Sequence, residues 1–147
     1  MTVRVREIRA EQTHGLRGRV LRPGQPPEQL VYPNDASPDS WHVGAFVDAV
    51  LVGIASIYRE AHPEQPDPHA WRLRGMAVDP SVQRRGLGRQ LVLACIGHVK
   101  AQGGSQLWCN GRTSAADFYR SLGFELVGAE FATESGPHYV MRLLLQG

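Results

Sequence analysis

Long hydrophobic runs are absent from this sequence. No apolar stretch approaches the roughly 20 residues that a membrane-spanning helix needs. The first ten residues, Met1–Ala10, also lack the apolar block of a secretory signal peptide. We therefore expect a cytoplasmic protein without a membrane partner.

Cysteine is scarce, and metal ligands are not grouped. The two cysteines, Cys95 and Cys109, are too few for a disulfide framework. Both lie among apolar residues, which favours small buried side chains. A reactive Cys109 thiol is the alternative, but no activating partner can be placed beside it. Four of the six histidines, His14, His62, His69 and His98, have no other candidate role and show no metal-ligand spacing, so no metal site is expected.

Neither sign of charge is in large excess. The 16 basic and 14 acidic residues give a net charge of +2, which argues against a nucleic-acid partner. One basic cluster, Arg84, Arg85 and Arg89, surrounds two glycines. A small anionic ligand suits a cluster of this size. Nucleic-acid binding through the same arginines is an alternative, although no aromatic platform accompanies them.

Hydrophobic periodicity and turn residues predict one α/β domain over residues 1–147, with a mixed sheet and no internal repeat or linker. Five prolines make Arg22–Ser40 a long loop. The predicted strands are Val3–Ile8, Trp41–Val47, Leu51–Tyr58, Trp71–Val78, Leu107–Asn110, Phe124–Thr133 and His138–Leu145. The predicted helices are Glu11–Leu21, Gly88–Gln102 and a third that opens at a capping box, Ser114–Asp117. One face of this third helix carries Ala115, Phe118, Tyr119 and Leu122.

The segment from Gly75 to Arg89 carries the clearest chemical signal. A strand stops at Asp79-Pro80, and a loop containing Gly86 and Gly88 then opens a helix. A helix start presents unpaired N–H groups and the positive end of the helix dipole, and glycines let a phosphate approach the backbone. The sequence therefore predicts a pyrophosphate-binding loop. The alternative is an ordinary glycine-rich helix start with solvated arginines.

Two other phosphate-binding patterns are excluded. No Gly-Lys-Ser/Thr follows the glycines, so the Walker pattern is absent. Leu91 stands where the dinucleotide fingerprint needs its third glycine.

The apolar residues of the preceding strand change phase along its length. They occupy odd positions at Trp71 and Leu73 but even positions at Met76 and Val78. A β-bulge near Arg74-Gly75 would explain the change and would free backbone groups to bind a ligand. A strand buried on both faces explains it equally well.

These residues resemble the GNAT N-acetyltransferase superfamily. Gln83-Arg84-Arg85-Gly86-Leu87-Gly88 matches the family loop Gln/Arg-x-x-Gly-x-Gly/Ala, and Ala115 to Phe124 resembles the family helix that ends in Phe/Leu-Tyr-x-x-x-Gly-Phe. The resemblance implies a single GNAT-like domain, with a mixed, mostly antiparallel central sheet of about 6–7 strands flanked by helices. It also implies acetyl-CoA as co-substrate and no metal.

The resemblance further implies the residues that bind the cofactor. The loop main chain would hold the pyrophosphate, and the strand residues would bind the pantetheine arm and polarise the thioester carbonyl. Arg112 stands where many members carry Asn, with Asn110 nearby at the strand end. The implied cofactor-binding residues are Met76, Ala77, Val78, Gln83, Arg84, Arg85, Gly86, Leu87, Gly88, Arg89 and Asn110.

The expected reaction is direct attack of a primary amine on bound acetyl-CoA. By resemblance, Tyr119 protonates the departing thiolate; the alternative is a core aromatic. His138, at the start of the last strand, is the expected base, because histidine titrates near neutral pH. Glu60, His42 or a water relay are alternatives.

The Arg22–Ser40 loop is expected to border the acceptor site. Its acidic residues, Glu28, Asp35 and Asp39, would favour a cationic acceptor, and Tyr32 would supply a contact face; solvated loop charges are the alternative. The acceptor is expected to be a small-molecule or peptide amine, and pairing as a homodimer is compatible with the sequence. A non-catalytic acyl-CoA-binding module is the second functional hypothesis.

Overall fold

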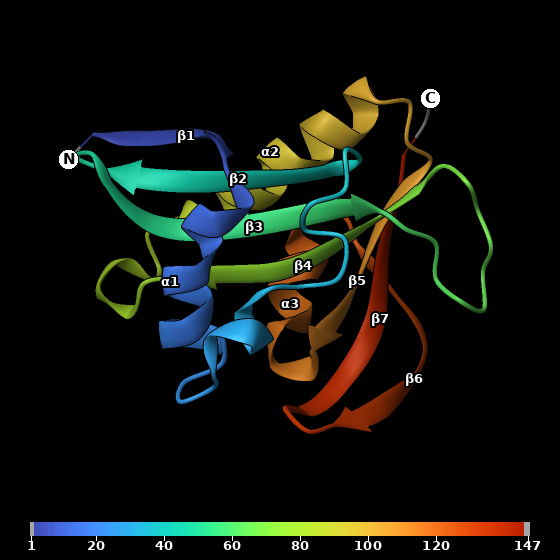
Figure 1. Cartoon of the computed structure of the whole chain (residues 1–147). Helices are drawn as coiled ribbons and strands as arrows, with labels where there is room; N and C mark the ends of the chain where they lie inside the picture. Colours follow the sequence, from blue (N-terminus) through green and yellow to red (C-terminus); the bar gives the residue numbers. More distant parts are fainter. Residues whose placement is uncertain (1, 146–147) are drawn as a thin grey trace. The chain divides into compact units, whose positions relative to one another are not determined.

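The computed structural model describes residues 2–145 and contains seven strands in the sheet order β1-β2-β3-β4-β5-β7-β6 (Figure 1). Strands β4 and β5 are parallel, whereas the pairs β1–β2, β2–β3, β5–β7 and β6–β7 are antiparallel. The predicted mixed, mostly antiparallel sheet is therefore confirmed. The strands are β1 Val3–Ile8, β2 Ser40–Val47, β3 Val50–Arg59, β4 Ala70–Val78, β5 Gln106–Arg112, β6 Glu125–Thr133 and β7 Gly136–Leu144.

The chain forms two compact units. The first consists of Met1–Tyr58 and Leu73–His98, and the second of Arg59–Arg72 and Val99–Gly147. Each unit is described by itself below.

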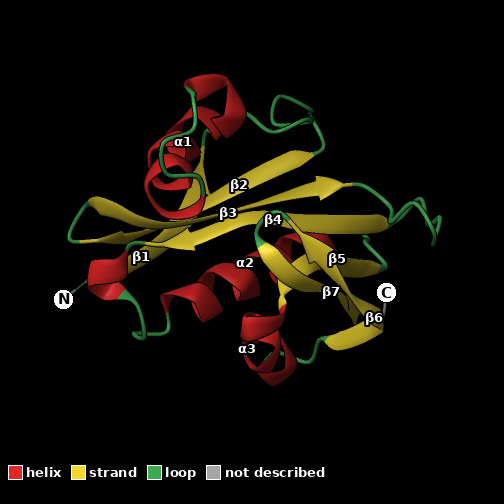
Figure 2. Ribbon diagram, turned by 90° about the horizontal axis from the view of Figure 1, so that it is seen from below, coloured by secondary structure: helices red, strands yellow, loops and turns green. Residues whose placement is uncertain are grey.

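In the first unit, helices lie on both faces of strands β1, β2 and β3. Figure 2 shows α1 (His14–Leu16) on one face and α2 (Leu87–Ala101) on the other. The α1 side buries Ile8, Leu16, Phe46, Ile54 and Ala77 in one apolar cluster. On α2, Leu91, Val92 and Cys95 are fully buried, as their three- and four-residue spacing predicts.

The turn between β2 and β3 uses two residues with positive φ, Asp48 at 48° and Ala49 at 73°. Two such residues form the tight hairpin turn whose twist matches that of its strands. The predicted strands Trp41–Val47 and Leu51–Tyr58 are confirmed as β2 and β3, which also include Ser40, Val50 and Arg59.

The first helix differs from its prediction. Residues Ala10–Leu21 are helical but not one regular α-helix, because a 3-10 turn (Ala10–Thr13) precedes α1 and a π-helical turn (Arg17–Leu21) follows it. The N–H of Arg22 donates to the Arg17 carbonyl at 2.9 Å, which is the i to i+5 bond of a π-turn. The Arg22–Ser40 loop is confirmed as mainly irregular, with one 3-10 turn at Pro27–Leu30.

In the second unit, β5 pairs with both β4 and β7, and β7 pairs with β6. A third helix, α3 (Ala116–Ser121), follows a 3-10 turn after β5. The predicted capping box at Ser114 is wrong, because Ala115 takes the N-cap position without a side-chain hydrogen bond. The buried face of α3 includes Ala116 rather than Ala115.

Candidate functional site

The glycine-bearing loop of the first unit is anchored to the strand before it. The Asp79 N–H donates to the Val52 carbonyl at 2.7 Å, and the Asp79 carboxylate accepts hydrogen bonds from the Ser81 N–H and hydroxyl at 3.0 and 2.8 Å. The side-chain amide of Gln83 donates to the Val78 carbonyl at 3.1 Å. Gln83 therefore ties the start of the loop to the end of β4.

The loop backbone has the conformation of an anion-binding turn. Arg84 and Gly86 have positive φ values of 67° and 78°. Alternating left-handed residues turn neighbouring N–H groups towards one point, which forms a concave anion site. A non-glycine residue such as Arg84 is strained there, and strain of this kind clusters at functional sites. Residues 83–86 are exposed, so a ligand can reach this backbone.

The start of α2 adds further donors to the loop. The Gln90 N–H donates to the Gly86 carbonyl at 3.1 Å, which is the first bond of the helical ladder. The N–H groups of Leu87, Gly88 and Arg89 precede that bond and have no carbonyl one turn earlier within the helix. A Cβ at Gly86 would meet no atom within 4 Å, so the main chain is open on that side. These residues fit a pyrophosphate group.

Replacing Gly86 with alanine is expected to weaken acetyl-CoA binding about tenfold. The Cβ would strain a residue at φ 78°, and the left-handed conformation costs an L-residue about 1–2 kcal/mol. Isothermal titration calorimetry measures the effect. Gly97→Ala in α2 is the matched control, because a Cβ there also meets no atom within 4 Å. Equal affinity in both variants would show that the loop conformation is not needed for binding.

Strand β4 is irregular where the sequence changes phase. Gly75 has a φ of 66°, which is typical of a glycine bulge. After Gly75 the buried side chain is Ala77, whereas Met76 and Val78 are only half-buried. After Ala70, the buried side chains of β4 keep to odd positions, at Trp71, Leu73 and Ala77, so the buried face does not change phase and the irregularity at Gly75 is one of backbone conformation.

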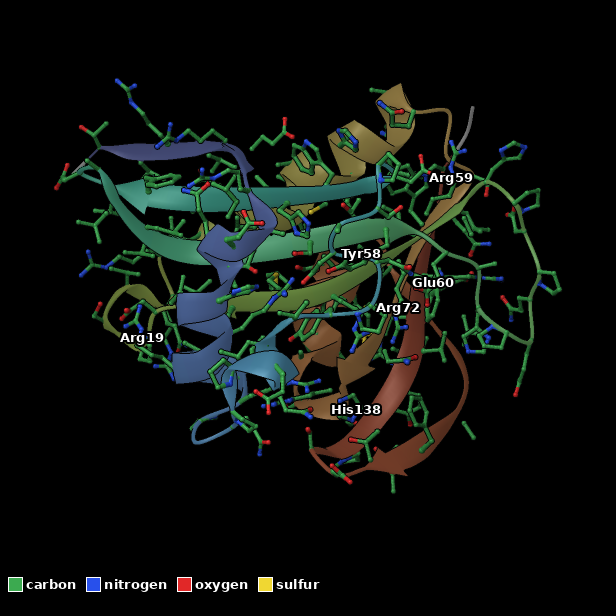
Figure 3. The ribbon with its side chains drawn as sticks, viewed as in Figure 1. Arg19, Tyr58, Arg59, Glu60, Arg72 and His138 are labelled. Atoms are coloured by element: carbon green, nitrogen blue, oxygen red, sulfur yellow. The ribbon has the colours of Figure 1, made fainter. Side chains whose placement is uncertain are left out.

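A buried network that the sequence did not reveal lies beside this strand in the first unit. The guanidinium of Arg17, which is 0% exposed, donates to the two carboxylate oxygens of Asp35 at 2.6 and 3.1 Å. It also donates to the Ser56 hydroxyl at 3.1 Å and the Tyr58 hydroxyl at 3.2 Å. The Tyr58 hydroxyl in turn donates to Asp35 at 2.5 Å; Figure 3 marks Tyr58 on β3.

The network keeps both members of the ion pair charged. Burial alone would raise the pKa of Asp35, but hydrogen bonds from Arg17, Tyr58 and the Tyr32 N–H outweigh it and lower that pKa. Burial alone would likewise lower the pKa of Arg17, but the hydrogen bond and the charge of Asp35 raise it. The pKa of Tyr58 is raised, mainly by burial and by its hydrogen bond to Asp35.

These contacts overturn the expectation for two of the loop residues, Asp35 and Tyr32. Asp35 cannot attract a cationic acceptor as a loop charge, because Arg17 occupies both of its oxygens. Tyr32 is 6% exposed and is therefore not an open contact face. The reason is that both side chains point inwards and contact the buried Arg17. The residues next to Arg17 in the sequence do not indicate that its charge is buried.

His42 belongs to the same network and is not a suitable base. Its Nε2 lies 3.2 Å from the Asp35 carbonyl, which can only accept, so this nitrogen carries the proton. Its Nδ1 lies 2.7 Å from the Ser56 hydroxyl. Burial lowers the pKa of His42, and both ring nitrogens are engaged.

In the second unit, Tyr119 projects from α3 into an aromatic cluster. The side chain is 7% exposed and packs edge-on against Phe118 and Phe124, with ring centroids 5.1 and 5.3 Å apart. Its side chain also shares a hydrogen bond with Cys109. Burial raises the pKa of Cys109 to about 12, and the bond with Tyr119 opposes that rise. Cys109 is therefore a protonated thiol, not a reactive thiolate.

His138 lies at the start of β7, near the β6–β7 turn (Figure 3). Its Nδ1 lies 2.9 Å from the Gly136 carbonyl and 3.1 Å from the Thr133 hydroxyl. Because the carbonyl can only accept, the proton is on Nδ1, and Nε2 is the nitrogen that can accept a proton.

The other candidate residues of the second unit differ in their surroundings: one forms an ion pair and two are exposed to solvent. Glu60 is engaged, because its carboxylate accepts a hydrogen bond from Arg72 at 2.8 Å, and the two labelled side chains lie together in Figure 3. Asn110 and Arg112 are exposed on β5, opposite Val140 and His138 of β7.

Comparison with known proteins identifies the family. The family model of the acetyltransferase (GNAT) domain matches residues 24–145. This chain belongs to the GNAT acetyltransferase family. A GNAT relative from Bacillus subtilis, described as the uncharacterized N-acetyltransferase YitI, is 34% identical over 138 residues, which is 93% of each chain. The N-alpha-acetyltransferase RimI of Mycobacterium tuberculosis is 32% identical over 113 residues, 73% of this chain and 68% of RimI.

Solved GNAT structures share the fold. The Escherichia coli ribosomal-protein-S18-alanine N-acetyltransferase has a TM-score of 0.76 at 20% identity and covers 99% of this chain and 97% of its own. An aminoglycoside 6'-N-acetyltransferase in complex with coenzyme A has a TM-score of 0.72 at 18% identity, with 96% of both chains covered. The GNAT resemblance seen in the sequence is thus confirmed, and the chain is an acetyltransferase.

Two features are absent from the part of this GNAT chain that the structure describes. No helix within residues 2–145 is both long and apolar enough to cross a membrane. Over the same residues, no group of three His, Cys, Asp or Glu side chains is arranged to hold a metal ion.

Proposed function

We propose that the chain, acting as a single domain over residues 1–147, transfers an acetyl group from acetyl-CoA to a primary amine. The observation that carries this proposal is the loop from Arg84 to Arg89, where left-handed residues and a helix start present main-chain donors on an exposed backbone. A GNAT neighbour crystallised with coenzyme A supports the same co-substrate. When bound, acetyl-CoA supplies an activated acetyl group as a thioester.

In this proposal the loop holds the pyrophosphate, with Gln83 as its anchor and the arginines adding positive charge. The side chains of Arg84, Arg85 and Arg89 neutralise phosphate charge, and the N–H groups of Leu87 and Gly88 donate to it. The main chain of Met76, Ala77 and Val78 binds the pantetheine arm and donates to the thioester carbonyl as negative charge develops on its oxygen. Asn110 is proposed as a further pantetheine ligand.

Two side chains move protons in the proposed reaction. His138 accepts the proton of the attacking ammonium at Nε2, because an amine must be neutral to attack. The new bond joins the amine nitrogen to the carbonyl carbon as the bond from that carbon to sulfur breaks. Tyr119 donates its hydroxyl proton to the departing sulfur, and the products are an amide and the free thiol of coenzyme A.

The related proteins indicate two classes of amine acceptor but do not identify the acceptor of this chain. One neighbour is named for a ribosomal-protein alanine and another for aminoglycosides, so both peptide and small-molecule amines occur in this fold. We propose an amine of one of these two classes. We also propose a cytoplasmic location, since Cys95 and Cys109 are both free thiols.

The proposal is tested by following thiol release from acetyl-CoA with a panel of amines. The panel contains amino acids, polyamines, an aminoglycoside and peptides with a free N-terminal alanine, and N-acetylated forms of the same compounds serve as controls. Both cysteines of the chain are buried, so they add little background to a thiol reagent. We expect release with at least one free amine and none with its acetylated control.

Two results would contradict the proposal in different ways. Tight acetyl-CoA binding without turnover of any amine would indicate a non-catalytic acyl-CoA-binding module. Failure of coenzyme A to bind at millimolar concentration would remove the acyl-transfer assignment altogether.

A further inference from the structure

Gly75 lies directly against the ring of Tyr32. An ideal Cβ at Gly75 would be 2.8 Å from Cε2 and 3.6 Å from Cζ of that ring, and 3.5 Å from Nε of Arg17. No side chain larger than hydrogen fits there while the ring keeps its place. The irregular point of β4 is thus covered by a residue from the Arg22–Ser40 loop.

The backbone conformation of a glycine is not fixed by the residue itself. Because it lacks a Cβ, it occupies positive and negative φ about equally. The φ of 66° at Gly75 must therefore be selected by its surroundings, of which the Tyr32 ring is the closest side chain. The conformation of Gly75 in turn sets the direction of the peptide groups that follow it, at Met76 and Ala77.

The Tyr32 ring is itself held by cations. The guanidinium carbons of Arg17, Arg74 and Arg22 lie 3.8, 4.5 and 5.2 Å from the ring centroid. Contacts at these distances are attractive because the ring face is electron-rich. Arg74 immediately precedes Gly75, so the ring touches both residues of the irregularity.

Asp35 and Arg17 fix the loop segment that carries Tyr32. The Tyr32 N–H donates to Asp35 Oδ2 at 2.8 Å, and the Asp35 N–H donates to the Tyr32 carbonyl at 3.1 Å. Arg17 donates to the Leu30 carbonyl at 2.7 Å, two residues before Tyr32. Arg17 also starts the π-helical turn, and π-turns occur frequently at functional sites.

A buried ion pair is a poor source of net stability, because desolvation offsets its attraction. A pair retained in this position is better explained by the geometry it imposes. We propose that Arg17, Asp35 and Tyr32 are positioning residues, which hold Gly75 in its left-handed conformation and so aim the β4 amide groups that polarise the thioester. This inference rests on the proposed acetyl transfer.

The decisive comparison is Tyr32→Leu against Tyr32→Phe. Phenylalanine keeps the aromatic ring that contacts Gly75 and Arg17, whereas leucine has no ring. The measurements are kcat, the affinity for coenzyme A, and the infrared stretching frequency of bound acetyl-CoA labelled with ¹³C at the thioester carbonyl. The frequency reports polarisation of the carbonyl, which a purely structural role would not change.

For Tyr32→Leu we expect kcat to fall between about tenfold and 100-fold. Removing a donor to the developing charge costs about 100-fold or more, and a donor that is only misaimed costs less. The carbonyl frequency should move towards its value in solution. The affinity for coenzyme A, which lacks the thioester but keeps the pantetheine arm that β4 also binds, should fall by much less than kcat. Tyr32→Phe should keep both kcat and the carbonyl stretching frequency close to their wild-type values. Arg17→Lys, which keeps the charge but not the bidentate contact, should resemble Tyr32→Leu in weaker form.

A wild-type frequency in Tyr32→Leu would overturn the inference, as would an equal loss of kcat and of coenzyme A affinity. If Tyr32→Leu does not fold by circular dichroism, Gly75→Ala replaces it: its Cβ displaces the ring, and the same loss of carbonyl polarisation is expected. The wild-type protein separates this inference from the proposed function. If wild type itself transfers no acetyl group, the proposed function fails before any variant is compared.

Discussion

Replacing Asp35 with alanine is expected to lower the free energy of unfolding by about 3–5 kcal/mol, because the change leaves a buried charge without its counterion. The Arg17 guanidinium is 0% exposed and the Asp35 side chain 5% exposed, so water cannot take the place of the carboxylate. Arg17 would also lose two of its hydrogen bonds, at 2.6 and 3.1 Å. Urea denaturation of the wild type and the variant measures the difference.

The double variant Arg17→Met with Asp35→Leu separates the cost of an unpaired buried charge from the cost of lost side-chain packing. Removing both charges removes the desolvation penalty of each, so much of the stability lost in Asp35→Ala should return. Arg19→Ala is the matched control for a pair on the surface. Arg19 and Asp79 are 3.1 Å apart with Arg19 62% exposed, and such pairs contribute about 0–1 kcal/mol. A loss for Asp35→Ala no larger than that for Arg19→Ala would contradict the buried-charge argument.

The same pair predicts the acid limb of stability. The pKa of Asp35 lies below its ordinary value of 3.8 in the folded protein. The unfolded chain therefore takes up this proton first, at about the ordinary value, and the folded chain only at lower pH. The stabilisation by Asp35 is fully present above that ordinary value and is lost as the pH falls through the folded pKa. Asp35→Ala should lack this part of the pH dependence in denaturation curves.

Local pattern was sufficient for the seven strands, for α2 and for the position of the glycine-bearing helix start after β4. The apolar spacing of Leu91, Val92 and Cys95 predicts α2 because a helix face is set by residues three or four apart. Gly86 and the arginines predict an anion-binding helix start because every group involved lies within a few residues of the others. The left-handed conformation of Arg84 was not evident, since arginine carries no preference for positive φ.

The buried network could not be predicted, because its members are far apart in the chain. Arg17 and Asp35 are 18 residues apart, and Arg17 and Tyr58 are 41 apart. Each residue alone is an ordinary surface type, and arginine is almost never fully buried unless it is paired. A weak local signal did exist: the glycine at position 75 sits inside an apolar strand, where glycine indicates a bulge or a close approach of other atoms.

The Tyr119→Phe variant is expected to lower kcat about 100-fold or more, since a positioned acid contributes about 10²–10⁴-fold. Phenylalanine keeps the contacts with Phe118 and Phe124, whose centroids lie 5.1 and 5.3 Å away. The affinity for acetyl-CoA should therefore stay within about twofold of wild type, because the variant loses only the hydrogen bond with Cys109 and an interaction made as the sulfur departs. Steady-state kinetics and calorimetry supply the two numbers.

A matched variant makes this prediction specific. Tyr139→Phe, the same chemical change on β7 of the same unit, should leave kcat close to wild type. If Tyr119→Phe keeps full activity, solvent protonates the sulfur and Tyr119 serves the aromatic cluster alone. If Tyr139→Phe loses activity instead, the acid lies on β7 and not on α3.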